Sequence, residues 1–272
     1  MKLAINYSLA AGTLVKKGAI QIDAFKVPDW PNLVEEAGVI RPPAVHFSLQ
    51  AGNGKLAETN WKLVDRLLAN TATPYVNLHL DAHKDDFPGI PLGTTEPEHR
   101  EIVYERLLQD TMAVVSRYGA ERVIAENVPY KAEDGEYLRP GAEPELISRL
   151  IAETGCGLLL DISHARLAAH YMGIAEKEYL EQLPTGHIRE MHIAGVHVLA
   201  VGWQDHLSML EADWEMLAWV LERIKRKEWS QPWMLAFEYG GVGSIFAWRS
   251  DPEVMAEQVP RLYAMVHDIQ SA

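Results

Sequence analysis

Short segments of alternating apolar and polar residues recur along this chain, and stretches with helical spacing separate them. The clearest segment covers residues 44–49, in which Val45, Phe47 and Leu49 share one face and His46 lies on the other. A strand sends successive side chains to opposite faces. The alternation therefore predicts a β-strand with one wholly apolar face and one face that carries polar groups.

The same pattern predicts seven further strands. Apolar positions spaced three and four residues apart predict the helices between them. The predicted strands cover residues 3–8, 21–27, 75–81, 122–128, 157–163, 188–194 and 233–239. The predicted helices cover residues 56–70, 98–118, 143–153, 213–227 and 252–269, with a short helical segment among the prolines of residues 28–43 and further helical segments up to about residue 183. Strands that alternate with helices imply parallel βαβ units.

Eight such units in a chain of 272 residues have the size of a (β/α)₈ TIM barrel. The alternative is a doubly wound open sheet, which would carry a glycine-rich turn after its first strand. Residues 10–14 read AAGTL and lack the G-x-G-x-x-G fingerprint. Neither an internal repeat nor a linker divides the sequence. We therefore expect an α/β protein in which residues 1–272 form one barrel domain.

Composition narrows the kind of partner and the compartment. The formal net charge is −13, and the only short basic cluster is Arg223–Lys227, which argues against nucleic-acid binding. Because no run of about 18 apolar residues occurs, we expect no membrane span. The first residues read as a strand rather than as a signal peptide, and Cys156 is the only cysteine. These features favour the cytoplasm.

Acids and histidines stand near the carboxyl ends of most predicted strands. In a TIM barrel these ends line the face where active sites lie. The inward positions are His46, His79, Glu126, Asp161, His192 and Glu238; Asp81 and His164 lie just beyond, and the predicted loop 195–208 adds His197, Asp205 and His206. Burying three carboxylates and three imidazoles together without a cation would cost many kcal/mol. The pattern therefore predicts a metal cluster, and the donor set suits Zn, Fe or Mn.

Three motifs give the cluster a family resemblance. The order of these ligands along the strands resembles the xylose-isomerase-like TIM-barrel superfamily, which includes apurinic endonucleases, sugar isomerases and epimerases. Within it, Ala125–Val128 (AENV), Thr154–Asp161 (TGCGLLLD) and Glu190–Gly195 (EMHIAG) are similar to the multinuclear non-heme iron oxygenase family of methanobactin biosynthesis. Known members of that family oxidise cysteines in peptides. The specific similarity covers about residues 122–206 and Glu238.

The resemblance implies roles for individual residues. One metal ion would be held by His46, His79 and Glu126, and Glu126 would bridge to a second ion. The second ion would also be bound by Asp161, His192 and Glu238, and a third by His164, Asp205 and His206. Glu126, Glu238 and Asn127 would be catalytic, with Asn127 orienting Glu126 or the substrate. Lys84, Tyr130, Trp203 and Arg249 are candidate residues for the mouth of the site.

The sequence departs from the family at two positions. Many members carry asparagine where this chain has His164. The superfamily's trinuclear enzymes separate the later aspartate and histidine by one residue, whereas Asp205 and His206 are adjacent. Asp205 and His206 need not bind the same ion, and either His197 or His206 could be the ligand from the loop.

Several functions are compatible with this pattern. The motifs favour an oxidase or oxygenase that uses two or three divalent transition-metal ions, iron before zinc or manganese, on a peptide or small molecule. A peptide substrate would call for a partner protein or a recognition region. A metal-dependent sugar isomerase or epimerase is an alternative, with Glu126 and Glu238 moving the proton. A phosphoester hydrolase and a barrel that only binds are further alternatives, and the charge argues against a DNA substrate.

Overall fold

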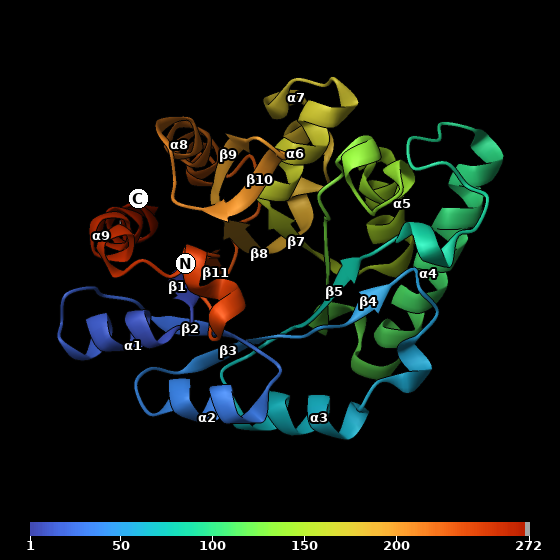
Figure 1. Ribbon diagram of the computed structural model, residues 1–272. Helices are drawn as coiled ribbons and strands as arrows, with labels where there is room; N and C mark the ends of the chain where they lie inside the picture. Colours follow the sequence, from blue (N-terminus) through green and yellow to red (C-terminus); the bar gives the residue numbers. More distant parts are fainter. Residues whose placement is uncertain (270–272) are drawn as a thin grey trace.

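Nine parallel strands form one sheet that curls around a central axis, and helices cover its outer side (Figure 1). The computed structural model describes residues 1–269. The strands lie in the order β3-β2-β1-β11-β8-β7-β6-β5-β4. They are β1 (Lys2–Asn6), β2 (Ala24–Pro28), β3 (Pro43–His46), β4 (Gln50–Ala51), β5 (Val76–Leu80), β6 (Val123–Glu126), β7 (Gly157–Asp161), β8 (Ile188–Ile193) and β11 (Met234–Phe237).

The predicted strand 44–49 is divided, and this division closes the barrel. Its two parts, β3 and β4, lie at the two ends of the sheet order. Between them the side chain of Asn77 on β5 replaces ladder hydrogen bonds. Its Oδ1 accepts from Phe47 N at 2.8 Å, and its Nδ2 donates to Phe47 O at 3.0 Å. The barrel has eight strand positions because β3 and β4 share one, so the predicted (β/α)₈ fold is confirmed.

Helices follow most strands, as the sequence pattern predicts. They are α1 (Leu9–Lys16), α2 (Pro31–Gly38), α3 (Trp61–Asn70), α4 (Pro97–Tyr118), α5 (Pro144–Thr154), α6 (Ile162–Met172), α7 (Glu176–Gln182), α8 (Glu211–Lys225) and α9 (Pro252–Asp268). Helix α1 was not predicted; Ser8 caps it by accepting a hydrogen bond from Ala11 N. Among residues 1–269, no helix combines the length and apolarity needed to span a bilayer.

Two further predictions of local structure were wrong. The strand predicted for residues 157–163 ends at Asp161, whose Oδ1 accepts from His164 N at 2.7 Å and caps α6. Ile162 and Ser163 are therefore helical. The predicted loop 195–208 is mostly an antiparallel hairpin of β9 (Gly195–Leu199) and β10 (Gly202–Leu207). The hairpin stands at the carboxyl end of β8, beside α6 (Figure 1).

The two faces of the sheet differ in the size of their side chains. The apolar residues that alternate with the polar positions of four predicted strands all belong to the main hydrophobic core: Val45, Phe47, Leu49, Val76, Leu78, Leu80, Leu158, Leu160, Ile162, Leu235 and Phe237. A separate cluster of Ala4, Ala24, Ala44, Ala236 and Met234 packs together. Register pairs Ala4 with both Ala24 and Ala236, on the face opposite the main core. The four alanines of this cluster leave space inside the barrel for long polar side chains.

Candidate metal centre

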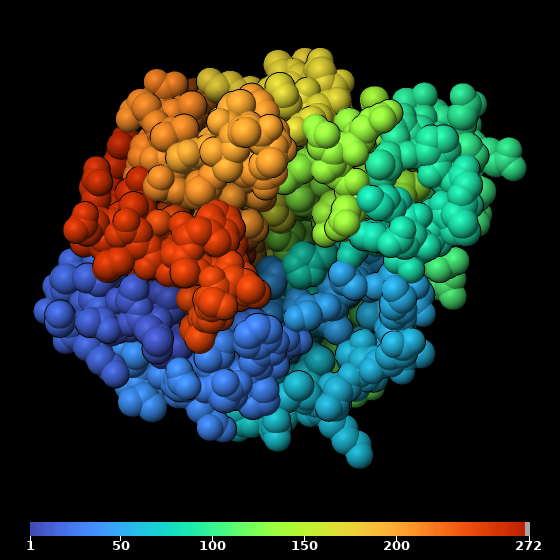
Figure 2. Space-filling view, in the orientation of Figure 1, coloured from blue at the N-terminus to red at the C-terminus, as the bar shows by residue number. Residues whose placement is uncertain are grey.

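A cavity of about 470 Å³ opens at the carboxyl ends of the barrel strands. In Figure 2 it appears as a hollow between the blue N-terminal, green central and red C-terminal segments. Seven of the nine predicted metal ligands line it: His46, His79, Glu126, His164, Asp205, His206 and Glu238. The other two, Asp161 and His192, are buried. The tertiary structure thus brings together side chains from five barrel strands, from the residue that follows β11, from helix α6 and from the hairpin.

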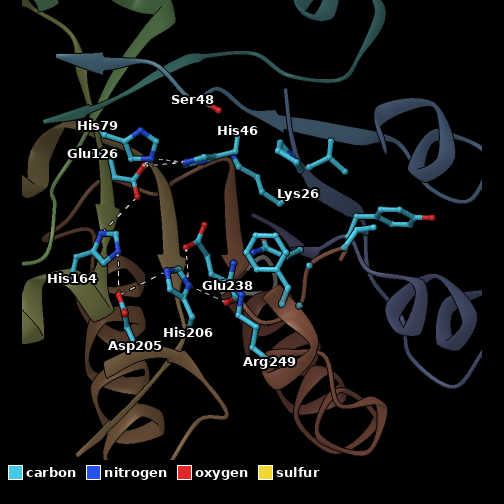
Figure 3. Close-up of a pocket in the computed structure, with 18 of the residues that line it drawn as sticks. Lys26, His46, Ser48, His79, Glu126, His164, Asp205, His206, Glu238 and Arg249 are labelled. Carbon is cyan, nitrogen blue, oxygen red and sulfur yellow. Dashed lines mark hydrogen bonds and ion pairs between the residues drawn. The ribbon is translucent and has the colours of Figure 1, made fainter. Parts of the chain in front are cut away.

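The first predicted group, on β3, β5 and β6, is assembled around one carboxylate oxygen. His46 Nε2 and His79 Nε2 lie 2.9 Å apart. Both face Glu126 Oε2, at 3.5 Å and 3.4 Å respectively (Figure 3). Leu49 O lies 3.0 Å from His79 Nδ1 and sets the orientation of that ring. Three donor atoms therefore converge on one position.

The second predicted group involves the other oxygen of Glu126. Its Oε1 lies 3.7 Å from His192 Nδ1 and 3.8 Å from His164 Nδ1. His192 Nδ1 also lies 3.1 Å from Glu238 Oε1. Asp161, His192 and Glu238 have ligand atoms within 4.8 Å of one another. The two oxygens of Glu126 thus face different sets of histidines.

The third predicted group joins α6 to the hairpin. His164 Nε2 lies 3.3 Å from Asp205 Oδ2, and His206 Nε2 lies 3.9 Å from the same oxygen. The register of the hairpin shifts between Gln204 and Leu207, and His206 has a φ of +60°. Such a bulge breaks strict alternation. It explains how Asp205 and His206 both line the cavity although they are adjacent.

The residues present fit bound cations. Within the described part of the chain, four overlapping groups of acids and histidines could each hold an ion. His46 Nδ1, His192 Nδ1 and Glu126 Oε2 are buried without a hydrogen-bond partner. Buried polar atoms normally have partners. Orphaned donor atoms inside such groups are the feature that a metal ion would satisfy.

The electrostatics of the cluster follow from burial and close acids. Burial lowers the pKa of His46 to about 3 and raises the pKa of Asp161 to about 6. Burial disfavours a charged His164, but Asp161 and Asp205 outweigh it and raise the pKa of His164 to about 10. Burial likewise opposes a charged Glu126, yet the neighbouring histidines hold its pKa well below the usual range. Protons on some histidines thus balance the acids, and metal binding would displace them.

A buried ion pair lies beneath the cluster, and neither of its members was predicted as a site residue. Lys26 on β2 donates to Glu190 Oε1 on β8, and both side chains are almost fully buried. The same oxygen lies 2.9 Å from His192 Nε2, and Trp233 Nε1 donates to the other at 3.0 Å. Glu190 therefore directs Nδ1 of His192 toward Glu126 and Glu238. Its position two residues before His192 was a usable signal, because both share one strand face.

Other predicted site residues have different environments. Asn127 is fully buried, and its side chain binds the backbone of Asp161, with Nδ2 donating to Asp161 O and Oδ1 accepting from Asp161 N. It does not line the cavity, so it positions Asp161 rather than contacting a substrate. His197 lies with its Nε2 2.6 Å from Ser208 O and does not line the cavity, whereas His206 does. His206 is therefore the better candidate for the hairpin's ligand.

Of the four candidate mouth residues, only Arg249 lines the cavity. Lys84 and Tyr130 lie outside its lining, and Trp203 stacks on His170. Asp81, which the sequence placed just beyond the ligands, lines the cavity and accepts from Gln50 Nε2. Tyr137 also lines it and was not predicted.

Comparison with known proteins identifies the family. Residues 45–231 match the family described as RiPP precursor modification enzyme MbnB/TglH/ChrH. The chain belongs to this family. The match includes the ligands from His46 to His206 and confirms the resemblance found in the sequence.

Curated relatives agree over shorter stretches. A UPF0276 protein of Bordetella pertussis is 34% identical over 86 residues, covering 29% of this chain and 30% of that protein. A UPF0276 protein of Rhizorhabdus wittichii is 30% identical over 166 residues, covering 57% of this chain and 54% of its own. The matched part of the chain thus spans about half or less of these relatives' length.

Solved structures support the fold. A D-psicose 3-epimerase crystallised with D-fructose aligns over the whole of both chains with a TM-score of 0.59 and 12% identity. A family 2 AP endonuclease from Brucella melitensis aligns over 95% of this chain and 98% of its own, with a TM-score of 0.51 and 14% identity. At these identities the likeness concerns the barrel alone. Together with the family match, it shows that this chain has a barrel of the xylose-isomerase-like type.

Proposed function

We propose that the chain is a multinuclear iron-dependent oxidase or oxygenase that modifies a peptide. The observation that carries this proposal is the position of Glu126. Its Oε2 faces His46 and His79, while its Oε1 faces His164 and His192. A carboxylate so placed can bridge two metal ions, whereas a site for one ion needs no such bridge. The family match supports a peptide as the substrate.

The residues around the cavity have separable tasks in this proposal. His46, His79 and Glu126 would hold one ion; Asp161, His192 and Glu238, with Glu126, a second; and His164, Asp205 and His206 a third. Iron ions bound there would supply redox chemistry with O₂ as the oxidant. Glu190 holds His192 by its Nε2, so that Nδ1 stays free for a ligand role. Glu238, whose Oε2 lies 3.5 Å from His206 Nδ1, lines the cavity and would accept a proton from a bound substrate.

The size of the cavity limits how much of a peptide can enter it. A space of about 470 Å³ holds only a few residues of a peptide. The rest of a precursor would lie outside it, so we also propose a partner protein or recognition region that presents the peptide. The test compares the rate at which the purified chain modifies a full-length precursor with and without the partner protein. Equal rates would refute the proposal of a partner.

The test is metal analysis of the protein purified without oxygen, followed by oxygen uptake. We expect two or three iron ions per chain, and oxygen uptake with a cysteine-containing peptide. A single manganese or magnesium ion per chain, without iron, would overturn the proposal.

A metal-dependent sugar epimerase is the second candidate, favoured by one observation. His192 Nδ1 lies between two carboxylates, 3.1 Å from Glu238 and 3.7 Å from Glu126. Two carboxylates at one site can remove and return a proton at a carbon next to a carbonyl. Exchange of solvent deuterium into a ketose, without oxygen uptake, would favour this candidate over the oxidase.

A further inference from the structure

The segment after β11 folds back over the mouth of the cavity and is held there by its own contacts. It contains a short 3₁₀ helix, η7 (Ser244–Arg249). Ser250 Oγ donates to Phe246 O at 2.9 Å and to Gly241 O at 3.3 Å. A Cβ at Gly241 would lie 2.6 Å from the Phe246 ring, so the absence of a side chain there lets the ring pack inward. These contacts hold Arg249, the last residue of η7, at the cavity.

Arg249 presents a cation to the cavity without an anionic partner. Its guanidinium carbon lies 4.7 Å from the ring centre of Phe246 and 5.6 Å from that of Trp248. Its Nε is buried without a hydrogen bond. Within residues 1–269 the guanidinium makes neither a hydrogen bond nor an ion pair, although it lines the cavity beside Glu238 and His206 (Figure 3). The two rings thus hold the guanidinium in place, and its N–H groups can donate to a ligand in the cavity.

The acids near Arg249 are already engaged by histidines. The Oε1 and Oε2 atoms of Glu238 lie 3.1 Å from His192 and 3.5 Å from His206. Asp205 Oδ2 lies 3.3 Å from His164. Burial lowers the pKa of Arg249, although Glu238 and Asp205 counteract it. Because a partly buried cation without an anion is unfavourable, its placement indicates a ligand that supplies one.

We propose that Arg249 binds an oxoanion of the substrate, a carboxylate or a phosphate, and so orients it toward the metal-ligating cluster. A planar guanidinium can bind two oxygens of either group at once. The cavity that it lines also has an apolar and aromatic part, formed by Tyr7, Trp30, Leu33, Val242 and Phe246. The favoured ligand therefore carries an anionic group next to an apolar one. This inference rests on the proposed function and adds to it the chemical class of the substrate.

Chemical protection tests the proposal on the whole chain. Phenylglyoxal modifies accessible arginines, and mass spectrometry reports the rate at each one. We expect N-acetyl-leucine or phenyl phosphate to slow modification of Arg249 at least fivefold, and the compound that protects identifies the source of the oxoanion. The uncharged N-acetyl-leucinamide should not protect. Equal protection by the amide, or no protection by either anion, would overturn the proposal.

Variants give an independent measure. The dissociation constant of the protecting anion, measured by calorimetry, should rise at least tenfold in Arg249→Gln and less in Arg249→Lys. Arg41→Gln is the matched control, because Arg41 is exposed, binds only Ile40 O and lies outside the cavity. An unchanged constant in Arg249→Gln would refute the proposal. Metal content should stay at the wild-type level in all three variants, so a missing iron cluster would count against the proposed function alone.

Discussion

Asp205 and His206 are adjacent in the chain, yet both side chains reach the same ligand group as His164. The shifted register of β10 and the φ of +60° at His206 make this possible. A related barrel that separates the two ligands by one residue would need only a regular strand, because residues i and i+2 share a face. The bulge here replaces the missing spacer. It also requires a positive φ at His206, which most residues other than glycine disfavour.

Replacing His206 should remove at most one metal ion per chain. Asparagine tolerates positive φ better than alanine. We therefore expect His206→Asn and His206→Ala to lose the same metal, and His206→Ala to have the lower melting temperature. His197→Asn is the control, since His197 sits on the same hairpin and contacts Ser208 O. Metal analysis decides the point: a loss in the control, with none in the His206 variants, would assign the ligand to His197.

Removing the bridging carboxylate should have a larger effect. Because the two oxygens of Glu126 face two sets of histidines, we expect Glu126→Ala to lose more than one metal ion per chain. Glu105→Ala, on the exposed side of α4, should keep the full complement. A loss of no more than one ion in Glu126→Ala, by elemental analysis, would show that Glu126 does not bridge.

Removing one partner of the Lys26–Glu190 ion pair should destabilise the protein more than removing both charges. Lys26→Met leaves Glu190 charged and buried, and we expect a loss of about 3–5 kcal/mol in the free energy of unfolding. The double variant Lys26→Met/Glu190→Gln should regain part of that loss, since no charge is left unpaired. Chemical denaturation measures both. If Lys26→Met were no worse than the exposed control Lys62→Met, the pair would carry no such role.

Asn127 should matter for stability and for the placement of Asp161. Asn127→Ala leaves the backbone N–H and C=O of Asp161 without their side-chain partners. Each buried group left unpaired costs about 1–3 kcal/mol. We therefore expect the free energy of unfolding to fall by at least about 1 kcal/mol. Asn70→Ala, which removes an exposed bond to Arg66 O, should change stability by less than about 0.5 kcal/mol. Equal melting temperatures of the two variants would contradict this role for Asn127.

Cys156 offers a probe of folding that lies outside the cavity lining. Burial raises the pKa of its thiol, and Thr154 Oγ1 donates to Sγ at 3.2 Å. The thiolate is the reactive form. We therefore expect no labelling of the native protein by a thiol reagent at pH 8, and one label per chain in guanidinium chloride. Because the thiol stays neutral in the folded state, stability should also fall as pH rises above about 9, the ordinary pKa of a thiol. Rapid labelling of the native protein would contradict the burial.

Much of the barrel could be predicted because its signals are local. The alternation at residues 75–81 and 157–161 specified both the strands and the face that each buries. The strand predicted for residues 157–163 failed only at its end, where Asp161 caps α6 with the same carboxylate that faces the cluster. A side chain that serves the local backbone and a distant site at once is difficult to assign from alternation alone. The hairpin at 195–207 failed for a related reason, because its polar residues gave no clear period.

The sequence by itself determined which residues could be ligands and that they stand at strand ends. Tertiary structure alone decided how they meet. The two orientations of Glu126, the pairing of Lys26 with Glu190 across 164 residues, and the unpaired guanidinium of Arg249 all depend on closure of the barrel. Asn77 contributes to this closure, because its amide binds Phe47 where the strand is interrupted. Contacts between distant residues follow from register and strand order, and a local pattern of apolar and polar positions does not encode them.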